Sequence, residues 1–568
     1  MIRRRKPGRL HWRRLTLALM ISLAVVAAFF AFDGAPLPGM IEGQTLNWRF
    51  RLRGPLPPPA DVAIIAIDDR TITTLNRWPL PRRVLAEAVD RLKAAGAVVI
   101  GIDLLLVDPE QPTDGHVLSS GDQQLYEALR AADRAVLSFA FTTLGPPQAP
   151  DAAIQQALDA VGFRAVEWPA DAGSAGLPQA TGTLAPMPPF LEFATIGHTN
   201  TPLDRDGTLR RLPVAIEFGD QLVPAFPIEV ARRFRGLMPS DLGLSVGRGL
   251  HLGPQMIALD AGTRLLLNYY GTSGTIETLS LIDLVQGRIP PEKLAHRAVL
   301  IGATAIGAGD SFVTPYSGTL PGVEVMATAT GNLLGNTALR RGATAAEWEV
   351  AAIILLGLVT FVAAHLPLPG AAAIAALAAL LGWGAVTQVA FDGRLLWLNV
   401  TFPAASILLN AGAAAIWGAL SEQRLRREAQ RQRRNLSRYH SPLIADLLAE
   451  GGTAALSDQE QPAAILFVDM ADSTRRTENM APGDTAEFLR QFHRRIEAAV
   501  LAHGGVLDRF TGDGAMVIFG VPTPRPDDAV SALACARDLT QEIAEWSAAL
   551  ADDGGAPLRI RIGVHFGS

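Results

Sequence analysis

The chain is almost free of cysteine. Among its 568 residues only Cys535 carries a thiol, so no disulfide can form within one chain. Charge of one sign is not in excess either, because a formal net charge of −5 gives no reason to expect nucleic acid as a partner. A clear small-x-small cleavage site is also missing after the first apolar segment, which favours an uncleaved membrane anchor over a removable signal peptide.

Apolar residues, in contrast, are abundant. They make up 49% of the chain, and its mean hydropathy is positive. A chain of 568 residues also exceeds what one hydrophobic core usually accommodates. These properties predict several domains together with segments that cross a membrane.

Four apolar segments are long enough to span a bilayer. They cover residues 15–32, 348–366, 370–391 and 395–420. The first follows a cluster of basic residues in the segment 1–14. Because the turns 365–369 and 392–394 are very short, we expect the last three spans to form a compact bundle.

The distribution of arginine predicts how the chain crosses the membrane. Basic residues gather in residues 1–14 and again after residue 423, and the positive-inside rule places both groups in the cytoplasm. Residues 33–345 then lie outside, although Arg340 and Arg341 are on the unfavourable side for this rule. We therefore expect a multi-pass protein of the bacterial inner (cytoplasmic) membrane.

The outer segment alternates between strands and helices. Apolar runs at 62–67, 97–103 and 297–302, with a helical pattern at 82–95, predict an α/β domain with a largely parallel sheet. Residues 144–190 are rich in Pro, Ala and Gly, and we interpret them as a long surface insertion.

Three aspartates follow strands of this segment. Asp68, Asp69 and Asp103 stand where two apolar runs end, so they would line a ligand crevice at the carboxyl edge of the sheet. Caps and turn formers are the alternative explanation for the same residues.

This region resembles the type-2 CHASE domain, an extracytoplasmic sensor found ahead of cyclases, kinases and phosphatases. The resemblance covers most of residues 40–340 and rests on motifs at 47–54, 67–69, 78–82, 299–304, 310–315 and 321–324. It implies a sensor for an extracytoplasmic ligand, whose chemical class the sequence leaves unknown.

Residues 421–460 form a linker after the last span. A short heptad-like seam runs through Leu425, Ala429, Gln432, Leu436, Tyr439 and Leu443, and Pro442 interrupts or ends it. A parallel pair of such helices would pass a rotation onward. A basic linker lying on anionic lipid headgroups is a second, compatible interpretation.

Two acidic residues stand out in the C-terminal segment. Asp469 closes the apolar run 463–468, and Asp513 lies in a Gly-Asp-Gly turn between two β-rich runs. A helical pattern over 488–500 separates them and ends at Gly504-Gly505. This order of strand, helix and hairpin predicts an α+β palm-like, ferredoxin-like domain.

Two carboxylates brought together by such a fold offer hard oxygen ligands for Mg²⁺ or Mn²⁺. Taken singly, each acid has a plainer explanation. An Asp after a strand is often a turn former or a helix cap, and Asp-Gly is an ordinary hairpin signal.

Residues 461–568 resemble the first two-thirds of a class III nucleotide cyclase catalytic domain. The segments 466–474 and 510–516 match the two metal motifs of that family. The resemblance implies that Asp469 and Asp513 hold two Mg²⁺ or Mn²⁺ ions per site, assisted by the backbone carbonyl of Met470.

The resemblance also implies a nucleotide site. Backbone amides of Ala471, Asp472, Ser473 and Thr474 would cradle phosphates at a helix start. Arg509 stands three residues before Gly512, where adenylate cyclases of this family usually place a Lys and guanylate cyclases a Glu. ATP is the expected substrate, with GTP possible. The alternative for Arg509 is a surface residue paired with Asp508.

The chain stops soon after the strand-like segment 559–568. The family's later elements, including an Asn and an Arg that steady the transition state, are absent from this sequence, so we expect a truncated catalytic domain. In the resembled enzymes the site forms between two catalytic domains, which implies a homodimer.

Together these features predict a multidomain membrane protein with an α/β extracytoplasmic sensor, four transmembrane helices and an incomplete palm-like cyclase domain. The expected activity is that of a receptor-type adenylate cyclase, which converts ATP to cyclic AMP and pyrophosphate. A non-catalytic receptor with a degenerate domain that binds nucleotide or a partner, or a guanylate cyclase, are the alternatives. A diguanylate cyclase is disfavoured because no Gly-Gly-Asp/Glu-Glu-Phe signature occurs.

Overall fold

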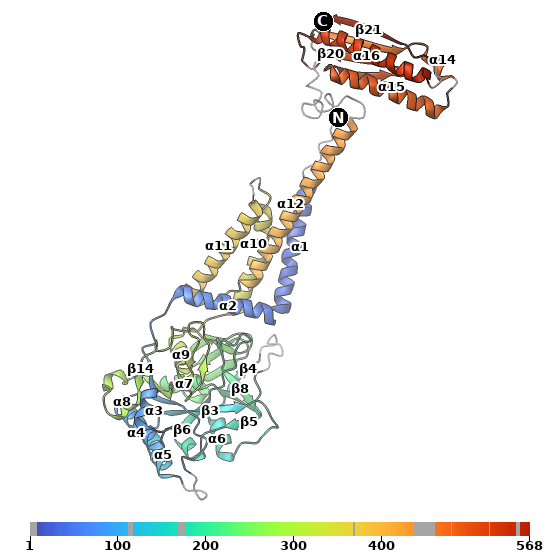
Figure 1. Ribbon diagram of the computed structural model, residues 1–568. Coiled ribbons are helices and arrows are strands. Elements are labelled where there is room, and N and C mark those ends of the chain that lie inside the picture. The colour runs from blue at the N-terminus through green and yellow to red at the C-terminus, as the bar shows by residue number, and fades with distance from the viewer. Residues whose placement is uncertain are drawn as a thin grey trace. The chain divides into compact units, whose positions relative to one another are not determined.

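The computed structural model describes residues 8–111, 118–168, 177–366, 368, 370–436, 460–478, 480–521, 523–552 and 557–568. The chain divides into two compact units, Met1–Ile416 and Trp417–Ser568. Figure 1 shows the first unit with a mixed α/β domain and long helices, and the second with one small sheet and its helices.

The α/β domain of the first unit is built on a seven-stranded sheet with the order β14-β1-β15-β2-β3-β5, and β6 also pairs with β3. Its strands are β1 (Val62–Ile67), β2 (Val99–Asp103), β3 (Ala135–Thr142), β5 (Gly182–Leu184), β6 (Ala194–His198), β14 (Thr278–Ser280) and β15 (Ala298–Ala303). All its pairings are parallel except that of β5. Every residue of β1 and β15 is buried, as expected for strands covered on both faces.

Helices cover both faces of this sheet. On one face lie α4 (Arg82–Ala94), α5 (Ser120–Ala132) and α8 (Leu281–Val285), and on the other α7 (Phe226–Phe234) and α9 (Gly322–Gly335). A glycine permits the close approach of α9, because a Cβ on Gly302 of β15 would lie 2.5 Å from the Val323 side chain. The short helix α3 (Asp69–Leu75) follows β1 directly.

Smaller elements complete the domain. A four-stranded sheet joins β4 (Ala165–Glu167), β10 (Leu242–Ser245), β11 (Gly249–Leu252) and β12 (Gln255–Ala258). Two-stranded ribbons join β7 (Arg211–Pro213) to β13 (Arg264–Leu266), β8 (Ala215–Phe218) to β9 (Gln221–Pro224), and β16 (Ser311–Phe312) to β17 (Leu320–Pro321). Single 3₁₀ turns occur at Pro188–Glu192, Pro239–Asp241 and Pro291–Lys293.

The interpretation of residues 144–190 as a surface insertion is wrong for much of that segment. It contains helix α6 (Ala152–Val161) and strands of both sheets, and Leu158, Val161 and Phe163 are buried in the core. Apolar residues of α6 repeat at helical spacing. The segment around this helix is rich in Pro and Gly, and its overall composition therefore predicted a surface insertion instead of a helix.

Among the residues that the structure describes, four helices are long and apolar enough to cross a membrane, over Arg14–Phe32, Thr344–Ala363, Ala371–Arg394 and Thr401–Glu428. They belong to α1 (Gly8–Phe32), α10 (Ala343–Ala363), α11 (Ala371–Arg394) and α12 (Thr401–Leu436). Ser22 of α1 and Ser406 and Asn410 of α12 lie within hydrogen-bond distance of one another. Gly357 of α10 makes room there, because a Cβ would lie 2.5 Å from each serine hydroxyl.

The boundary between the third and fourth spans differs from the prediction. Helix α11 continues through the expected turn 392–394 to Arg394, and α12 begins at Thr401, so residues 395–400 are not helical. They pair with the chain near Arg340 instead: the amide of Arg340 donates to the Leu395 carbonyl at 2.7 Å, and the Trp397 amide donates to the Arg340 carbonyl at 2.9 Å. The apolar run there buries the Trp397 side chain instead of extending the span.

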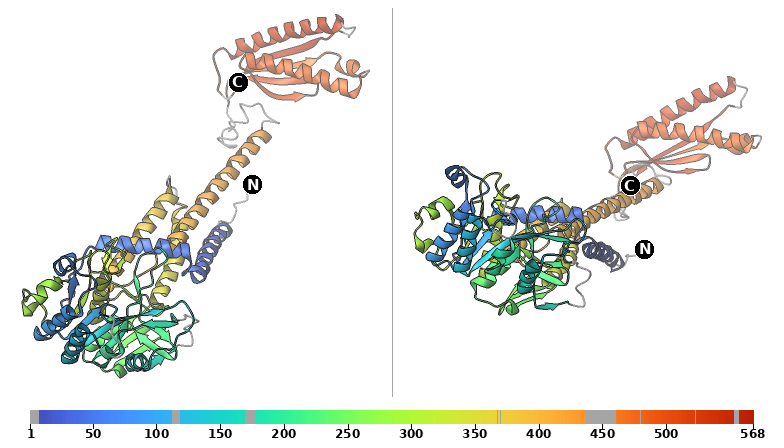
Figure 2. Two further views of the ribbon diagram at one scale, coloured as in Figure 1. Left: turned by 60° about the horizontal axis from the view of Figure 1, so that its bottom comes forward. Right: turned by 90° about the horizontal axis from the view of Figure 1, so that it is seen from below.

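Helix α2 (Pro36–Arg53) was not anticipated from the sequence. Three residues separate it from the end of α1, and it runs across the ends of the long helices that lie nearest the α/β domain (Figures 1 and 2).

The second unit confirms the predicted α+β palm. Its antiparallel sheet has the order β19-β20-β18-β21, from β18 (Ala463–Met470), β19 (Val506–Thr511), β20 (Gly514–Phe519) and β21 (Ile560–Gly567). Helices α15 (Pro482–Ala502) and α16 (Asp528–Asp552) pack on one face, where Leu466, Val468, Phe492 and Val517 are buried together. The short α14 (Ser473–Thr477) follows β18.

Only part of the predicted seam is described. Leu425 lies exposed on α12, which ends at Leu436, whereas Tyr439, Pro442 and Leu443 lie outside the described residues. The pairing of two such helices therefore stays a prediction.

Candidate active site and sensor cleft

Strand register brings the two predicted metal ligands together. In the pairing of β18 with β20, Asp469 lies opposite Gly514, which directly follows Asp513 at the hairpin tip. Asp469 is also paired with Arg561 of β21, so it lies within a central strand and is neither a turn former nor a helix cap. The plainer explanation for Asp469 is therefore wrong. Asp469 is exposed and Asp513 is half-buried.

Glycine at position 514 allows the hairpin to approach β18 closely beside Asp469. A Cβ there would lie 2.8 Å from the Val468 carbonyl oxygen and 3.2 Å from Oδ1 of Asp469. Gly512, on the other side of Asp513, has a φ of +70°, a conformation that favours glycine. The Gly-Asp-Gly turn is thus required by both shape and backbone geometry.

Asp513 is tied to the segment after β18. The Ser473 hydroxyl, at the first residue of α14, donates a short hydrogen bond to Oδ2 of Asp513. This contact links the two sequence segments that carry the predicted metal and phosphate ligands.

His493 supports the hairpin tip from α15 and was not found by sequence reasoning. Its Nε2 donates to the Gly512 carbonyl at 3.0 Å, and its ring stacks on Phe510 with centroids 3.9 Å apart. Burial lowers the pKa of His493, which favours the neutral ring. No motif in the sequence marks this residue, because it stands beside the apolar seam of α15 and not in it.

The predicted phosphate turn is arranged differently at its first residue. The amide of Ala471 donates to the Arg559 carbonyl at 2.9 Å and so belongs to the sheet. Asp472 follows with a φ of +56°. Because the Ala471 amide is already hydrogen-bonded, the predicted phosphate contacts are reduced to the backbone amides of Asp472, Ser473 and Thr474.

Arg509 extends into solvent from β19. Its side chain is 69% exposed, and its Nε donates to Oδ2 of Asp508 at 2.7 Å. The pairing with Asp508 that the alternative explanation requires is therefore present. An exposed pair of this kind is weak and would release Arg509 at little cost.

The residues present fit divalent cations. Two carboxylates and the carbonyl of Met470, the last residue of β18, would make an oxygen-only donor set, which suits Mg²⁺ or Mn²⁺. The described residues contain no group of three or more His, Cys, Asp or Glu side chains that would complete a metal site alone. Remaining ligands would have to come from backbone, water or nucleotide.

A cleft of about 790 Å³ opens at the carboxyl edge of the large sheet in the first unit. Its walls include Asp103, the last residue of β2, together with Ser138 of β3 and Asp310 after β15. The chain leaves β2 toward α5 on one face and leaves β15 toward α9 on the other. Neighbouring strands whose connections diverge in this way form the usual ligand crevice of a parallel sheet.

Ser138 and Asp103 are two polar residues that line this cleft. The Ser138 hydroxyl is 1% exposed and has no hydrogen-bond partner among the described residues. Burial, together with the nearby charge of Asp310, raises the pKa of Asp103 to about 7.

The other two predicted crevice residues do not line the cleft. Asp68 caps α3, where Oδ1 accepts from the Thr71 amide at 2.8 Å and from the Ser280 hydroxyl at 3.0 Å. Asp69 is exposed in the first turn of α3. The cap explanation therefore holds for Asp68, and the crevice explanation for Asp103.

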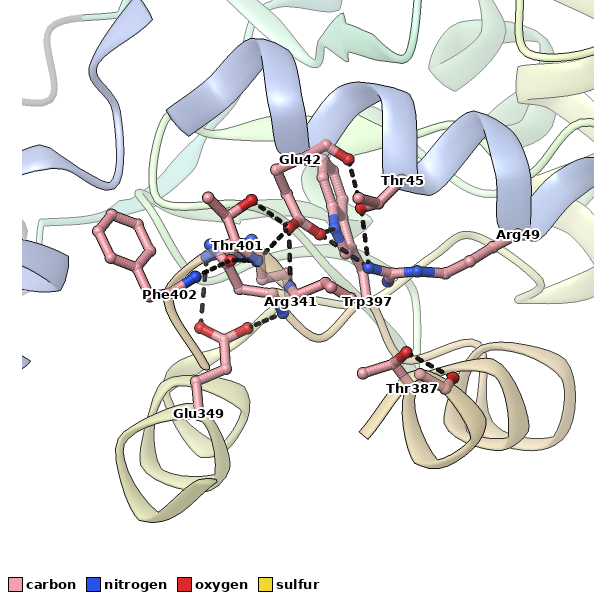
Figure 3. A network of polar contacts seen from close by, with 12 residues as sticks. Glu42, Thr45, Arg49, Arg341, Glu349, Thr387, Trp397, Thr401 and Phe402 are labelled. Atoms are coloured by element: carbon pink, nitrogen blue, oxygen red, sulfur yellow. Dashed lines mark hydrogen bonds and ion pairs between the residues drawn. The ribbon is translucent and has the colours of Figure 1, made fainter. Parts of the chain in front are cut away.

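A buried polar network joins α2 to the start of α12 (Figure 3). Oε1 of Glu42 accepts from Arg49 at 2.8 Å and from the Trp397 indole at 2.9 Å. Oε2 accepts from the amides of Val400 and Thr401 at 2.8 and 3.2 Å. A carboxylate at the first turn of a helix also interacts favourably with its dipole, so Glu42 anchors the N-terminus of α12.

Arg341 is part of the same region. Its guanidinium contacts Asp33 at 2.9 Å and Glu349 at 3.4 Å. The structure therefore holds this arginine in an ion-pair network with two acids.

These features define a membrane protein in which an α/β domain with a ligand cleft precedes a palm domain with a two-carboxylate site. Comparison with known families agrees. Residues 20–363 match the CHASE2 domain, and residues 456–568 match the adenylate and guanylate cyclase catalytic domain. The chain belongs to the CHASE2 family and carries a class III cyclase catalytic domain, a domain type that uses divalent metals.

Individual relatives match a part of the chain. An adenylate cyclase of Mycobacterium bovis is 31% identical over 159 residues, which are 27% of this chain and 35% of that protein. An adenylate cyclase of Mycobacterium tuberculosis matches to the same extent. The chain thus spans about a third of the length of the curated relatives it matches.

Solved structures also match a part of the chain. The guanylyl cyclase Cya2 is 32% identical and covers 19% of this chain and 54% of its own, with a TM-score of 0.18. The adenylyl cyclase CyaB from P. aeruginosa is 26% identical and covers 19% and 57%, with a TM-score of 0.19. With TM-scores this low, these structural matches carry no weight in the family assignment.

Proposed function

We propose that this protein is a membrane-bound receptor cyclase that converts ATP to cyclic AMP and pyrophosphate under the control of its CHASE2 domain. The observation that carries the proposal is the register of β18 and β20, which sets Asp469 beside the Asp513 hairpin. The CHASE2 domain lies outside the inner membrane of a bacterium and the palm domain in the cytoplasm, where ATP is available.

The chain's own residues divide the work. Asp469, Asp513 and the Met470 carbonyl would hold two divalent ions, and such ions would supply charge stabilisation at the ribose 3′-hydroxyl and at the pyrophosphate leaving group. Ser473 orients Asp513 through its hydrogen bond, and His493 orients the turn through Gly512. Backbone amides of residues 472–474 contact the phosphates.

Base recognition falls to Arg509. After leaving Asp508, its guanidinium would donate to the adenine edge, although its planar fork differs from the ammonium of a lysine. Because the same fork can also serve guanine acceptors, the selectivity between ATP and GTP is a quantity to measure. The expected assembly is a homodimer, because the site of the enzymes that this domain resembles forms between two catalytic domains.

Control by the outer domain has a structural path. A ligand in the cleft at Asp103 would change the domain that packs on α2, and Glu42 joins α2 to the start of α12. Helix α12 continues without a break from Thr401 to Leu436. A displacement at Glu42 therefore acts on the end of one uninterrupted helix.

Turnover by membranes that carry the protein, expressed from its own gene, tests the proposal. ATP or GTP is supplied with Mn²⁺, and both cyclic nucleotides are quantified. Asp469→Asn and Asp513→Asn should each lower cyclic AMP formation by about 100-fold or more, because each removes a group that acts on the transition state. Asp527→Asn, the same change at an exposed acid of the same domain, is the matched control.

Three results would contradict the proposal in different ways. Activity retained in Asp513→Asn removes the two-metal assignment. Cyclic GMP as the main product makes the protein a guanylate cyclase. No product from either nucleotide, with nucleotide binding intact, identifies a receptor whose palm domain serves only binding.

A further inference from the structure

One side of helix α2 carries a stripe of exposed apolar residues. Leu37, Ile41, Trp48 and Leu52 are 73%, 53%, 64% and 71% exposed. At 3.6 residues per turn these four positions fall within about 60° of one another around the helix axis. Met40, Gln44 and Arg51 flank the stripe, and all three are exposed.

The remaining circumference of α2 is buried by protein. Asn47 accepts a hydrogen bond from Arg210 of the outer domain at 3.1 Å, and Phe50 packs edge-to-face on Tyr269 and Phe391. Glu42 and Arg49 form the buried pair described above. One face of α2 is thus buried against protein, and the apolar stripe forms a second face that is exposed.

The whole length of α2 lies level with the ends of the membrane spans. Its first residue, Pro36, follows the end of α1 at Phe32 by four positions. Its middle binds the first residues of α12 through Glu42. Its last turns contact the end of α11, where the Gln388 amide donates to the Arg49 carbonyl at 3.3 Å.

We propose that α2 lies in the headgroup region of the bilayer, in the leaflet nearest the CHASE2 domain, with the stripe Leu37, Ile41, Trp48 and Leu52 inserted among the lipids. Three anchors at span ends fix a helix of about 27 Å parallel to the membrane plane at this depth. The occupant of the stripe is therefore lipid. Figure 1 shows α2 running across the span ends in this orientation.

The composition of the stripe fits that environment. Trp is favoured at membrane interfaces, where one part of the ring is apolar and the other is hydrated. Arg51 at the edge of the stripe extends its charged end to the headgroups while its stem stays among apolar groups. Interfacial helices of this kind bury their apolar face by about 5–10 Å.

Site-directed spin labelling tests the depth of α2. The full chain in proteoliposomes carries one introduced cysteine at a time, in a Cys535→Ala background, and collisions of the label with oxygen and with a water-soluble nickel chelate are measured. Trp48→Cys is the test position. Leu144→Cys, 88% exposed in the outer domain, marks water, and Leu381→Cys, 66% exposed in α11, marks lipid.

The label at position 48 should favour oxygen over the chelate, with a ratio between those of the two markers. A ratio equal to that at Leu144 places the stripe in water and overturns the proposal. Protection from both reagents means that protein, such as a second copy, covers the stripe, and overturns it as well. Ile41→Cys repeats the measurement if Trp48→Cys does not fold.

Discussion

Asp469 and Asp513 stand far apart in the sequence. Backbone pairing between strands, rather than a contact between their side chains, brings them together. The pairing of Asp469 with Gly514 leaves the acids beside each other at the end of a rigid hairpin. Positions held by a strand register are more exact than positions on free loops, which suits ligands that must hold a metal.

Gly514→Ala should disturb that register. The added Cβ would meet the Val468 carbonyl at 2.8 Å, and overpacking of this kind costs about 1–3 kcal/mol. Thermal unfolding of the C-terminal unit in the purified full chain measures the loss.

Gly483→Ala is the matched control for that experiment. A Cβ at Gly483 meets open space in the first turn of α15, so the change should be neutral or should stabilise by up to about 1 kcal/mol. Equal behaviour of the two variants would mean that the hairpin tip relaxes freely.

Asp103→Asn should change how the stability of the CHASE2 domain depends on pH. The pKa of Asp103 is raised to about 7, so the folded state binds its proton more tightly than the unfolded state, and the parent loses stability as pH rises from about 4 to about 7. The variant lacks this loss, whose slope is at most about 1.4 kcal/mol per pH unit. Melting curves of parent and variant should therefore diverge in favour of the variant at pH 8 and converge at pH 4.

Helix α2 and the first turn of α12 form the connecting element of the first unit. Glu42 accepts five hydrogen bonds from α2, from the 395–400 segment and from α12. A single carboxylate thereby joins α2 to the continuous segment from Trp397 to Thr401, which lies about 355 positions later in the chain.

Glu42→Gln should weaken this element and uncouple the outer domain from turnover. Removing one charge leaves Arg49 buried without its anion, and breaking a buried pair costs about 3–5 kcal/mol at most. Glu347→Gln, the same change at an exposed position of α10, should have little effect. The readouts are the melting temperature of the purified chain and the cyclic nucleotide output of membranes. A variant that melts and responds like the parent would show that Glu42 is not the connecting residue.

Elements with a regular pattern were predictable from the sequence. Apolar runs and spacing-four positions indicated β18, α15 and β20, and length with composition indicated the four spans. Helix α2 was missed because its exposed face is apolar and its buried face holds Glu42, Asn47 and Arg49, which inverts the usual pattern. The start of α12 was missed because the apolar run at 395–400 packs as irregular chain.

At the site, motif residues were predictable and supporting residues were not. Asp469 and Asp513 stand in recognisable segments, whereas His493 acts through the fold by reaching Gly512 from another element. The hydrogen bond of the Ala471 amide could not be predicted from the sequence either, because its partner Arg559 belongs to a segment almost ninety residues later.

At the scale of the whole molecule, the reactivity of the single thiol indicates whether the C-terminal unit is folded. Cys535 is buried in the core of the C-terminal unit, and burial raises the pKa of its thiol to about 11. The thiolate is the reactive form, so alkylation at neutral pH should be slow in the folded chain and should become fast when this unit unfolds. Fast labelling of the native protein with iodoacetamide would contradict this packing.

The central place of β18 has a consequence for exchange with solvent. Because this strand is paired on both sides, with β20 and with β21, its amide protons are released only when the sheet itself opens. In deuterium oxide the segment 464–469 should therefore be the last of the C-terminal unit to take up label. The strand that carries Asp469 should then keep its geometry while other parts of the C-terminal unit open locally.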